Sequence, residues 1–81
     1  TYLFDGKTHL NDFLKVLSFD EDYLDEAKGE AETLAGLMLE IRKDFLRRGE
    51  TLAYRRLTLR VDAMDGRRID KIRVTVADSE D

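Results

Sequence analysis

The sequence predicts an α+β fold, a two-layer sandwich with two helices on one face of a small, mainly antiparallel sheet, in the order β-α-α-β-β-β. Two observations carry this prediction. Apolar residues recur with the helical period of 3.6 over residues 9–17 and 33–43, and with the strand period of two over residues 57–76. Eighty-one residues allow one domain. We place it at residues 1–77 and expect a frayed tail over residues 78–81.

The chain opens with a short predicted strand over residues 2–4, which ends at the turn signal Asp5-Gly6. A helix over residues 9–17 should follow, because its apolar residues are spaced i, i+3, i+4 and i+7. These are Leu10, Phe13, Leu14 and Leu17. Thr8 is the expected N-cap of this helix.

Residues 18–32 form a predicted long connection that carries seven acidic residues between Asp20 and Glu32. A helical turn is expected within residues 23–28. Gly29 should prevent this turn from continuing into the next helix.

The second main helix is predicted to begin near Thr33, its cap, and to end near Lys43. Its buried stripe should comprise Leu34, Leu37, Met38 and Ile41. Leu39 falls outside this stripe, so the helix is expected to be covered on more than one side. Phe45 and Leu46 should then fold back onto the core.

Gly36 costs this helix about 1 kcal/mol relative to alanine. We interpret it as a position where the missing Cβ permits the helix and a neighbouring element to approach closely.

The period changes to two after residue 50, which predicts a strand over residues 51–54, a turn at Arg55-Arg56, and a strand over residues 57–63. A tight type I′ turn needs positive φ, which is unfavourable for arginine, so the first turn should be longer or of type I. Asp65-Gly66 is a strong signal for the second turn.

The last strand contains apolar residues that a regular strand cannot place on one face. Ile72, Val74 and Val76 share one phase, but Ile69 lies three residues before Ile72. A β-bulge near residues 70–71 would restore Ile69 to the buried face.

Composition argues against several classes of function. The net charge is −4, with 18 acidic and 14 basic residues, which does not favour nucleic-acid binding. No apolar run approaches the roughly 18–20 residues of a membrane span, so we expect no direct membrane insertion. Without cysteine there is neither a disulfide nor a thiolate metal site. The first residue is Thr1, so the chain is expected to be an excised piece.

Several stretches, taken together and in this order, resemble the transporter-associated domain that ends CorC/HlyC-type, hemolysin-related membrane proteins. They are "YLFDGKTHLNDF", "ETLAGLMLEI", the pair Gly49-Glu50, and "MDGRRIDKIRV". The residues that carry the motif are Thr33, Gly36, Asp65, Gly66 and Arg67. The stretches "THLNDFLKVLSFDED" and "AETLAGLMLEIR" are similar in sequence to the gliding-motility-associated branch of this family.

The resemblance implies a regulatory, non-enzymatic module at the cytoplasmic C-terminus of a protein with an N-terminal transmembrane region and a pair of CBS domains. Such proteins are linked to magnesium and cobalt efflux. The expected partners are the CBS domains and membrane region of the parent chain, at the cytoplasmic face of the inner membrane. The domain is expected to form a homodimer. It is expected to have no catalytic residue and no cofactor.

Two side-chain groups offer alternatives to this interpretation. Oxygen ligands at Asp20, Asp22, Asp25 and Glu26 could chelate a divalent cation, although a solvated acidic connection fits the spacing better. Three arginine doublets, at residues 47–48, 55–56 and 67–68, could gather at one end of the sheet and bind an anion, although ion pairs with the acidic connection and solvation of the turns explain them better. Together they define the alternative function, a sensor of a nucleotide, a flavin or a divalent cation. His9, the only histidine, is expected to be a first-turn helix residue and not a zinc ligand.

Overall fold

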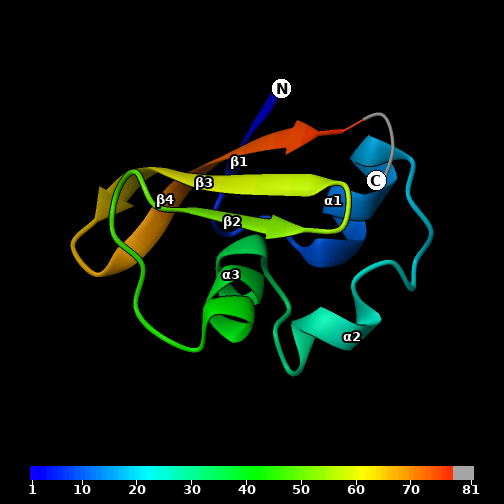
Figure 1. The fold of residues 1–81 in the computed structure, drawn as a ribbon, viewed down its shortest axis with the longest axis horizontal. Coiled ribbons are helices and arrows are strands. Elements are labelled where there is room, and N and C mark those ends of the chain that lie inside the picture. Colours follow the sequence, from blue (N-terminus) through cyan, green and yellow to red (C-terminus); the bar gives the residue numbers. More distant parts are fainter. Residues whose placement is uncertain (78–81) are drawn as a thin grey trace.

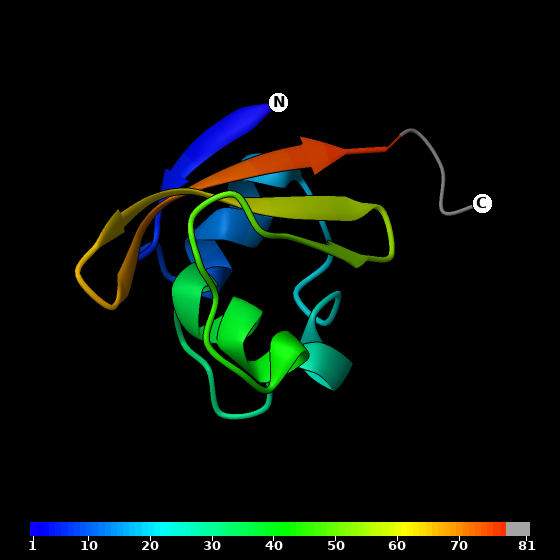
Figure 2. The ribbon, with the colours of Figure 1, turned by 60° about the vertical axis from the view of Figure 1, so that its left-hand side comes forward.

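The structure, a computed structural model, describes residues 1–77 as two layers (Figure 1). The elements follow in the order β1 (Tyr2–Asp5), α1 (Leu10–Leu17), α2 (Asp25–Lys28), α3 (Leu34–Arg42), β2 (Thr51–Tyr54), β3 (Leu57–Asp65) and β4 (Arg68–Val76). The strands form one antiparallel sheet in the order β1-β4-β3-β2. Figure 2 shows the helices together on one face of this sheet. The predicted fold class is confirmed, and α2 is the expected helical turn. The tail predicted at residues 78–81 lies outside the described residues.

The core lies between the sheet and the helices, as the two periods predicted. Along β3, buried and exposed residues alternate from Leu57 to Val61. The helices contribute Leu10, Phe13 and Leu14 from α1 and Leu34, Leu37 and Met38 from α3, all at most 4% exposed. Ile41, the fourth residue of the predicted α3 stripe, is only partly buried. Burial of apolar surface is the main force that holds the two layers together.

The predicted Thr8 cap is wrong by one residue, because Thr8 is already part of another contact. The backbone N–H of Leu34 donates to the carbonyl of Thr8 at 2.9 Å, and His9 forms an isolated antiparallel bridge with Thr33. The chain therefore stays extended through His9, the N-cap of α1. Thr33, by contrast, caps α3 as predicted: its side chain accepts a hydrogen bond from the N–H of Gly36 at 3.3 Å.

One expectation about the far side of α3 is wrong, and a second holds for only one of its two residues. Leu39 is 42% exposed, because the sheet covers only one side of α3. Of the pair that follows the helix, Leu46 is buried but Phe45 is 77% exposed. Lys43 ends the helix at φ 61°, and the Asp44 carboxylate accepts the N–H of Phe45 at 2.7 Å. Neighbouring side chains in an extended segment point to opposite sides, so only one of the two can enter the core.

The turn between β2 and β3 is tighter than the sequence suggested. Tyr54 pairs with Leu57, which leaves a two-residue turn, and Arg55 adopts φ 53°. The expectation of a longer or type I turn is therefore wrong. Positive φ at the first central residue suits the twist of the flanking strands, and side-chain contacts described below hold Arg55 in place.

The ladder between β3 and β4 contains two irregularities, of which the sequence predicted one. Val61 pairs with Ile72, Ala63 with Lys71, and Met64 with Ile69. Asp70 is thus extra on β4, as predicted, and Asp62 is extra on β3. Together the two extra residues restore Ile69 to the buried face, where it is 7% exposed. Its ladder partner Met64 lies on the same face and is partly buried.

Gly6, rather than Gly36, occupies the tightest glycine position. A Cβ on Gly6 would lie 2.1 Å from the carbonyl oxygen of Ile69 and 3.3 Å from the Cβ of Ala35. The Gly6 backbone also bonds to both neighbours: its N–H donates to Asp70 at 2.8 Å, and its carbonyl accepts from Ala35 at 3.0 Å. Gly6 is therefore where β1, the β4 bulge and α3 meet.

Gly36 has a close neighbour, but not in the other helix or the sheet. A Cβ there would lie 3.2 Å from the Cβ of Ala31 and 3.4 Å from the hydroxyl of Thr33. The close approach expected at Gly36 thus involves the segment that leads into α3.

An ion pair joins the edge strand β1 to β4. Asp5 and Lys71 are partners in the ladder, and the Lys71 ammonium donates a hydrogen bond to the Asp5 carboxylate. This hydrogen bond raises the pKa of Lys71 above its ordinary 10.5. A raised pKa means that the pair contributes to stability at neutral pH and that the contribution is lost as the pH rises through the raised value.

Candidate functional site

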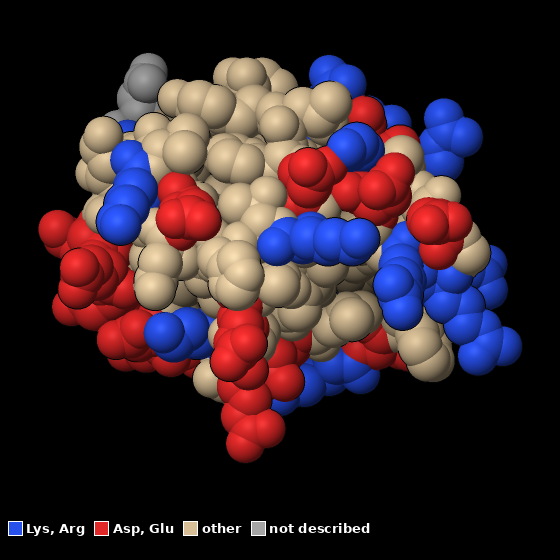
Figure 3. All heavy atoms as spheres, turned by 180° about the vertical axis from the view of Figure 1, so that it is seen from behind, with Lys and Arg blue, Asp and Glu red and all other residues tan. Residues whose placement is uncertain are grey.

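Acidic side chains gather at one end of the molecule, and basic side chains, with some acidic ones among them, lie at the other. In Figure 3 most of the acidic side chains crowd at the left-hand and lower edge, and most of the basic ones lie on the right. The first end belongs to the connection around α2, and the second to the turn between β3 and β4, as comparison with Figure 1 shows. Each end has a hollow, and the two hollows hold most of the side chains that the sequence singled out.

The acidic hollow brings together the four residues considered as cation ligands. Asp20, Asp22, Asp25 and Glu26 line a space of about 580 Å³ with Tyr23, Tyr54 and Arg55. Within residues 1–77, however, no group of three or more histidine, aspartate and glutamate side chains is arranged to hold a metal ion. Lys28 forms an ion pair with Asp25 at 3.4 Å. The residues predicted together are thus neighbours around a hollow and do not form a coordination sphere.

Tyr23 anchors this connection to the turn between β2 and β3. Its ring stacks on Phe19 with centroids 4.4 Å apart, and the Arg55 guanidinium lies 4.2 Å from the centre of the Tyr23 ring. Its hydroxyl accepts the backbone N–H of Arg56 at 3.0 Å. The cation–π contact with Tyr23 suits an arginine at position 55. At position 56 the arginine guanidinium lies 5.4 Å from the centre of the Phe19 ring, and its Nε donates to the carbonyl of Ala77 at 2.9 Å. This doublet therefore has a structural role.

We expect Tyr23→Phe to lower the free energy of unfolding by about 0.5–1.5 kcal/mol, the range for one lost hydrogen bond. Urea unfolding followed by circular dichroism measures it. The phenylalanine keeps the stack on Phe19, so the loss isolates the bond to Arg56. Unchanged stability would show that water replaces the hydroxyl at no cost.

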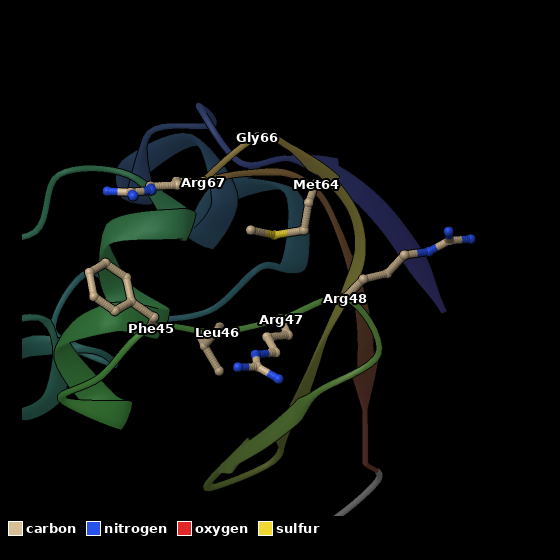
Figure 4. Close-up of a pocket in the computed structure, with 7 residues that line it drawn as sticks. All are labelled: Phe45, Leu46, Arg47, Arg48, Met64, Gly66 and Arg67. Atoms are coloured by element: carbon tan, nitrogen blue, oxygen red, sulfur yellow. The ribbon is translucent and has the colours of Figure 1, made fainter.

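The hollow at the opposite end, hereafter the hairpin-end hollow, has an apolar floor and an arginine rim. Its volume is about 480 Å³, and its lining is shown in Figure 4. The lining residues are Phe45, Leu46, Arg47, Arg48, Met64, Gly66 and Arg67. Two segments build it: the chain between α3 and β2, and the turn between β3 and β4.

Local geometry fixes each wall of this hollow. The Glu50 carboxylate accepts the N–H of Arg47 at 2.7 Å and pairs with Arg42 at 3.5 Å, which holds the first segment in place. The second wall is a two-residue turn, since Asp65 pairs with Arg68, and Gly66 there has φ 63°. The irregular ladder described above brings Met64 to the helix side, so the bulges help to form the hollow.

The arginine rim carries charge without acidic partners. None of the residues that line the hollow is acidic. The guanidinium groups of Arg47, Arg48 and Arg67 make no ion pair with any residue of the described range 1–77. In Figure 4 these three side chains fan out in different directions around the floor.

The arginine doublets therefore do not gather at one place. Residues 47–48 and Arg67 meet at the hairpin-end hollow, whereas residues 55–56 lie at the acidic end. Sequence reasoning missed Phe45 and Met64 as surface-site residues. One feature of the sequence could have identified Phe45 as a surface residue: it is a large apolar residue close to a basic doublet and outside the helical stripe.

Comparison with known proteins places the chain in a family. The sequence matches the family described as Transporter associated domain, CorC/HlyC, over residues 1–78. The chain belongs to this family. A transporter associated domain from a CBS domain protein of Porphyromonas gingivalis is 37% identical, with a TM-score of 0.87, over 94% of this chain and 87% of that chain. The sequence-based recognition is confirmed.

Two further solved structures share the fold of this transporter associated domain at lower identity. The CorC/HlyC domain of a Xylella fastidiosa hemolysin, solved in complex with Mg²⁺ and Mn²⁺, is 24% identical with a TM-score of 0.74 over 94% of this chain and 86% of that one. A Neisseria meningitidis region described as associated with a Mg²⁺ and Co²⁺ transporter, CorC, is 21% identical with a TM-score of 0.77, over 93% of this chain and 86% of that one. Comparison with curated proteins finds no significant match.

The residues that carried the resemblance have structural positions in this transporter associated domain. Thr33 caps α3, Gly36 lies against Ala31, and Gly66 gives the β3–β4 turn its positive φ. Asp65 closes the β3–β4 ladder with Arg68. Arg67 lines the hairpin-end hollow and also a neighbouring hollow of about 440 Å³ beside Leu39 and Gly6. Among the described residues, no helix has the length and apolar character needed to span a membrane.

Proposed function

We propose that this domain is a non-enzymatic regulatory module of a membrane protein linked to magnesium and cobalt transport. It would act by docking on the CBS domains of the same polypeptide or on a second copy, and so bias the transport region. One observation carries the proposal: the chain shares 37% identity over nearly its whole length with a transporter associated domain taken from a CBS domain protein. The Neisseria region, described as associated with a Mg²⁺ and Co²⁺ transporter, supports the link to divalent cations.

The location and the assembly state belong to the same proposal. A module of this kind would lie at the cytoplasmic face of the inner membrane. The exposed edge strand β1, where Leu3 is 58% and Tyr2 43% exposed, supports self-association as a homodimer, since edge strands are ready templates for pairing. Membership of the gliding-motility-associated branch stays a prediction.

Deleting this domain from its full-length membrane protein is expected to change Mg²⁺ and Co²⁺ efflux at least about twofold. A twofold change corresponds to a shift of roughly 0.4 kcal/mol in the equilibrium of the transport region that the domain biases. Efflux from loaded cells, with the amount of protein in the membrane matched by immunoblot, measures the effect. A point variant at the exposed Arg60, on the face of the sheet away from the helices, serves as the control. Unchanged efflux together with unchanged assembly would contradict the proposal.

The small-ligand alternative makes a different prediction for the isolated domain. A sensor of AMP, ATP, FAD, Mg²⁺ or Mn²⁺ would be stabilised by about 2.7 kcal/mol at a hundredfold excess of ligand over its Kd. A docking module should show no such shift in a thermal-unfolding experiment with the same compounds. The acidic hollow is the place to examine if Mg²⁺ or Mn²⁺ does stabilise the domain, and Asp22→Asn should then abolish the shift.

A further inference from the structure

We propose that the hairpin-end hollow binds a partner segment of defined chemistry, an acidic peptide that carries one large apolar side chain. This inference rests on the docking role proposed above and names the surface and the kind of partner. Three properties of the hollow carry it: an apolar floor left open to solvent, a rim of arginines without acidic partners, and the directions of those arginines.

The floor offers a place for one large apolar side chain. Phe45 is 77% exposed, more than any other large apolar residue described, and lies beside the buried Leu46 and the partly buried Met64. A volume of about 480 Å³ lies within the usual range for ligand sites. Methionine adapts its shape readily to an incoming side chain. The floor therefore suits an aromatic or branched side chain from a partner.

The rim selects for negative charge. Arg47 and Arg67 flank the floor, and Arg48 lies at its edge with its side chain directed outward. No acidic residue lines this hollow, and the three guanidinium groups form no ion pair within residues 1–77. The chain as a whole has more acidic than basic residues, so a hollow without an acidic lining residue departs from its composition. The aspartates at this end of the sheet line the neighbouring hollow that Arg67 also borders: Asp5, Asp65 and Asp70. Complementary charge steers association and fixes the orientation of a partner.

The arrangement of the arginines favours a peptide over a small anion. Figure 4 shows Arg67 on one side of the floor, Arg47 on another, and the Arg48 side chain directed away from both. A single phosphate accepts hydrogen bonds over a few ångströms only, so it cannot engage all three. Carboxylates spaced along an extended segment can meet Arg67 on one side of the floor and Arg47 on the other, while one apolar side chain between them enters the floor.

The acidic connection of a second copy does not meet both requirements. It supplies carboxylates, but its large apolar side chains are engaged in its own fold: Tyr23 and Leu24 are buried, at 9% and 1% exposure, and Phe19 packs against the core and stacks on Tyr23. Docking it in the hollow would leave the apolar floor unfilled. The partner we infer is therefore a different segment, in which the apolar side chain is free.

The test is a titration of the ¹⁵N-labelled domain with a synthetic peptide of aspartates and glutamates around one central phenylalanine. We expect amide shifts confined to residues 45–48 and 64–67. Phe45→Ser should weaken binding about tenfold and Arg67→Gln about fivefold, with Arg60→Gln as a control that changes it less than twofold. Phe45, Arg67 and Arg60 are all exposed, so these variants should keep the dispersed spectrum of the folded domain.

Several outcomes would overturn the inference. They are an absence of shifts at millimolar peptide, shifts centred elsewhere, equal binding of the same peptide with alanine in place of its phenylalanine, or equal or tighter binding of AMP at these amides. The efflux experiment above is independent of this one. Altered efflux without peptide binding would reject the hairpin-end hollow as the binding surface and leave the docking role standing. Peptide binding without altered efflux would reject the docking role and leave the binding surface standing.

Discussion

Gly6→Ala should destabilise the domain by about 3 kcal/mol, near the upper end of the range for overpacking. The added Cβ would lie 2.1 Å from the carbonyl oxygen of Ile69, which is a backbone atom and cannot rotate aside. Relief requires the chain at Gly6 or the β4 bulge to move, and the hydrogen bonds of Gly6 to Asp70 in that bulge and to Ala35 in α3 oppose such a movement. For a domain of this size the loss corresponds to a drop in Tm of roughly 12–24 °C.

Thermal unfolding followed by circular dichroism measures the effect of Gly6→Ala, and Gly36→Ala is the matched control. At Gly36 the new Cβ would meet Ala31 at 3.2 Å, a tight contact, while the helix gains about 1 kcal/mol of propensity. The two effects oppose each other, so Gly36→Ala should change stability by less than about 1 kcal/mol. Equal changes in Tm at the two glycines would refute the assignment of Gly6 as the tight position.

Periodicity was sufficient to predict the fold because each element here buries one face only. The alternation in β3 from Leu57 to Val61 and the helical stripe that contains Leu37 and Met38 each specify a side to be covered. Once four strands and two amphipathic helices are recognised in this order, a two-layer sandwich is the simplest way to bury those faces. The offset of Ile69 from Ile72 even located the bulge at Asp70, because register errors would expose an apolar residue.

Features that depend on a distant neighbour could not be predicted. Asp5-Gly6 has the sequence of an ordinary turn, and only the packing of Ile69 and Ala35 against Gly6 shows that no side chain fits. Thr8 is a good N-cap by residue type, but its carbonyl is used by Leu34. In both places a tertiary contact overrides local preference.

The candidate site was predictable in its chemistry but not in its position. The arginine doublets were visible in the sequence, and one purpose considered for them was to bind a negative charge. Sequence spacing does not show that Arg67 lies beside Arg47, whereas Arg56 binds Tyr23 at the other end. The apolar half of the hollow was missed because Phe45 was expected in the core, and its outward direction depends on where α3 ends.

Phe13→Ala should be at least as damaging as Gly6→Ala, with an expected loss of about 3–5 kcal/mol, because the substitution leaves a cavity at the centre of the core. Phe13 is fully buried, and its ring packs edge-on against Phe4 with centroids 5.0 Å apart. Because Phe4 belongs to the edge strand, losing this contact should loosen β1 first. The total stability expected for 81 residues is about 4–12 kcal/mol, so the substitution would remove at least about a quarter of it.

Urea unfolding measures the global loss in Phe13→Ala, and amide hydrogen exchange reports on β1, whose protection should fall more than that of β3. Val16→Ala, on the same helix but at a side chain that is 56% exposed, should stay within about 0.5 kcal/mol of the parent. Both substitutions replace a residue of α1 by alanine, so both gain helix propensity. A difference in stability between Phe13→Ala and Val16→Ala therefore reports the effect of burial. If the two variants lost equal stability, the core contact between α1 and β1 could not be what holds the first strand to the sheet.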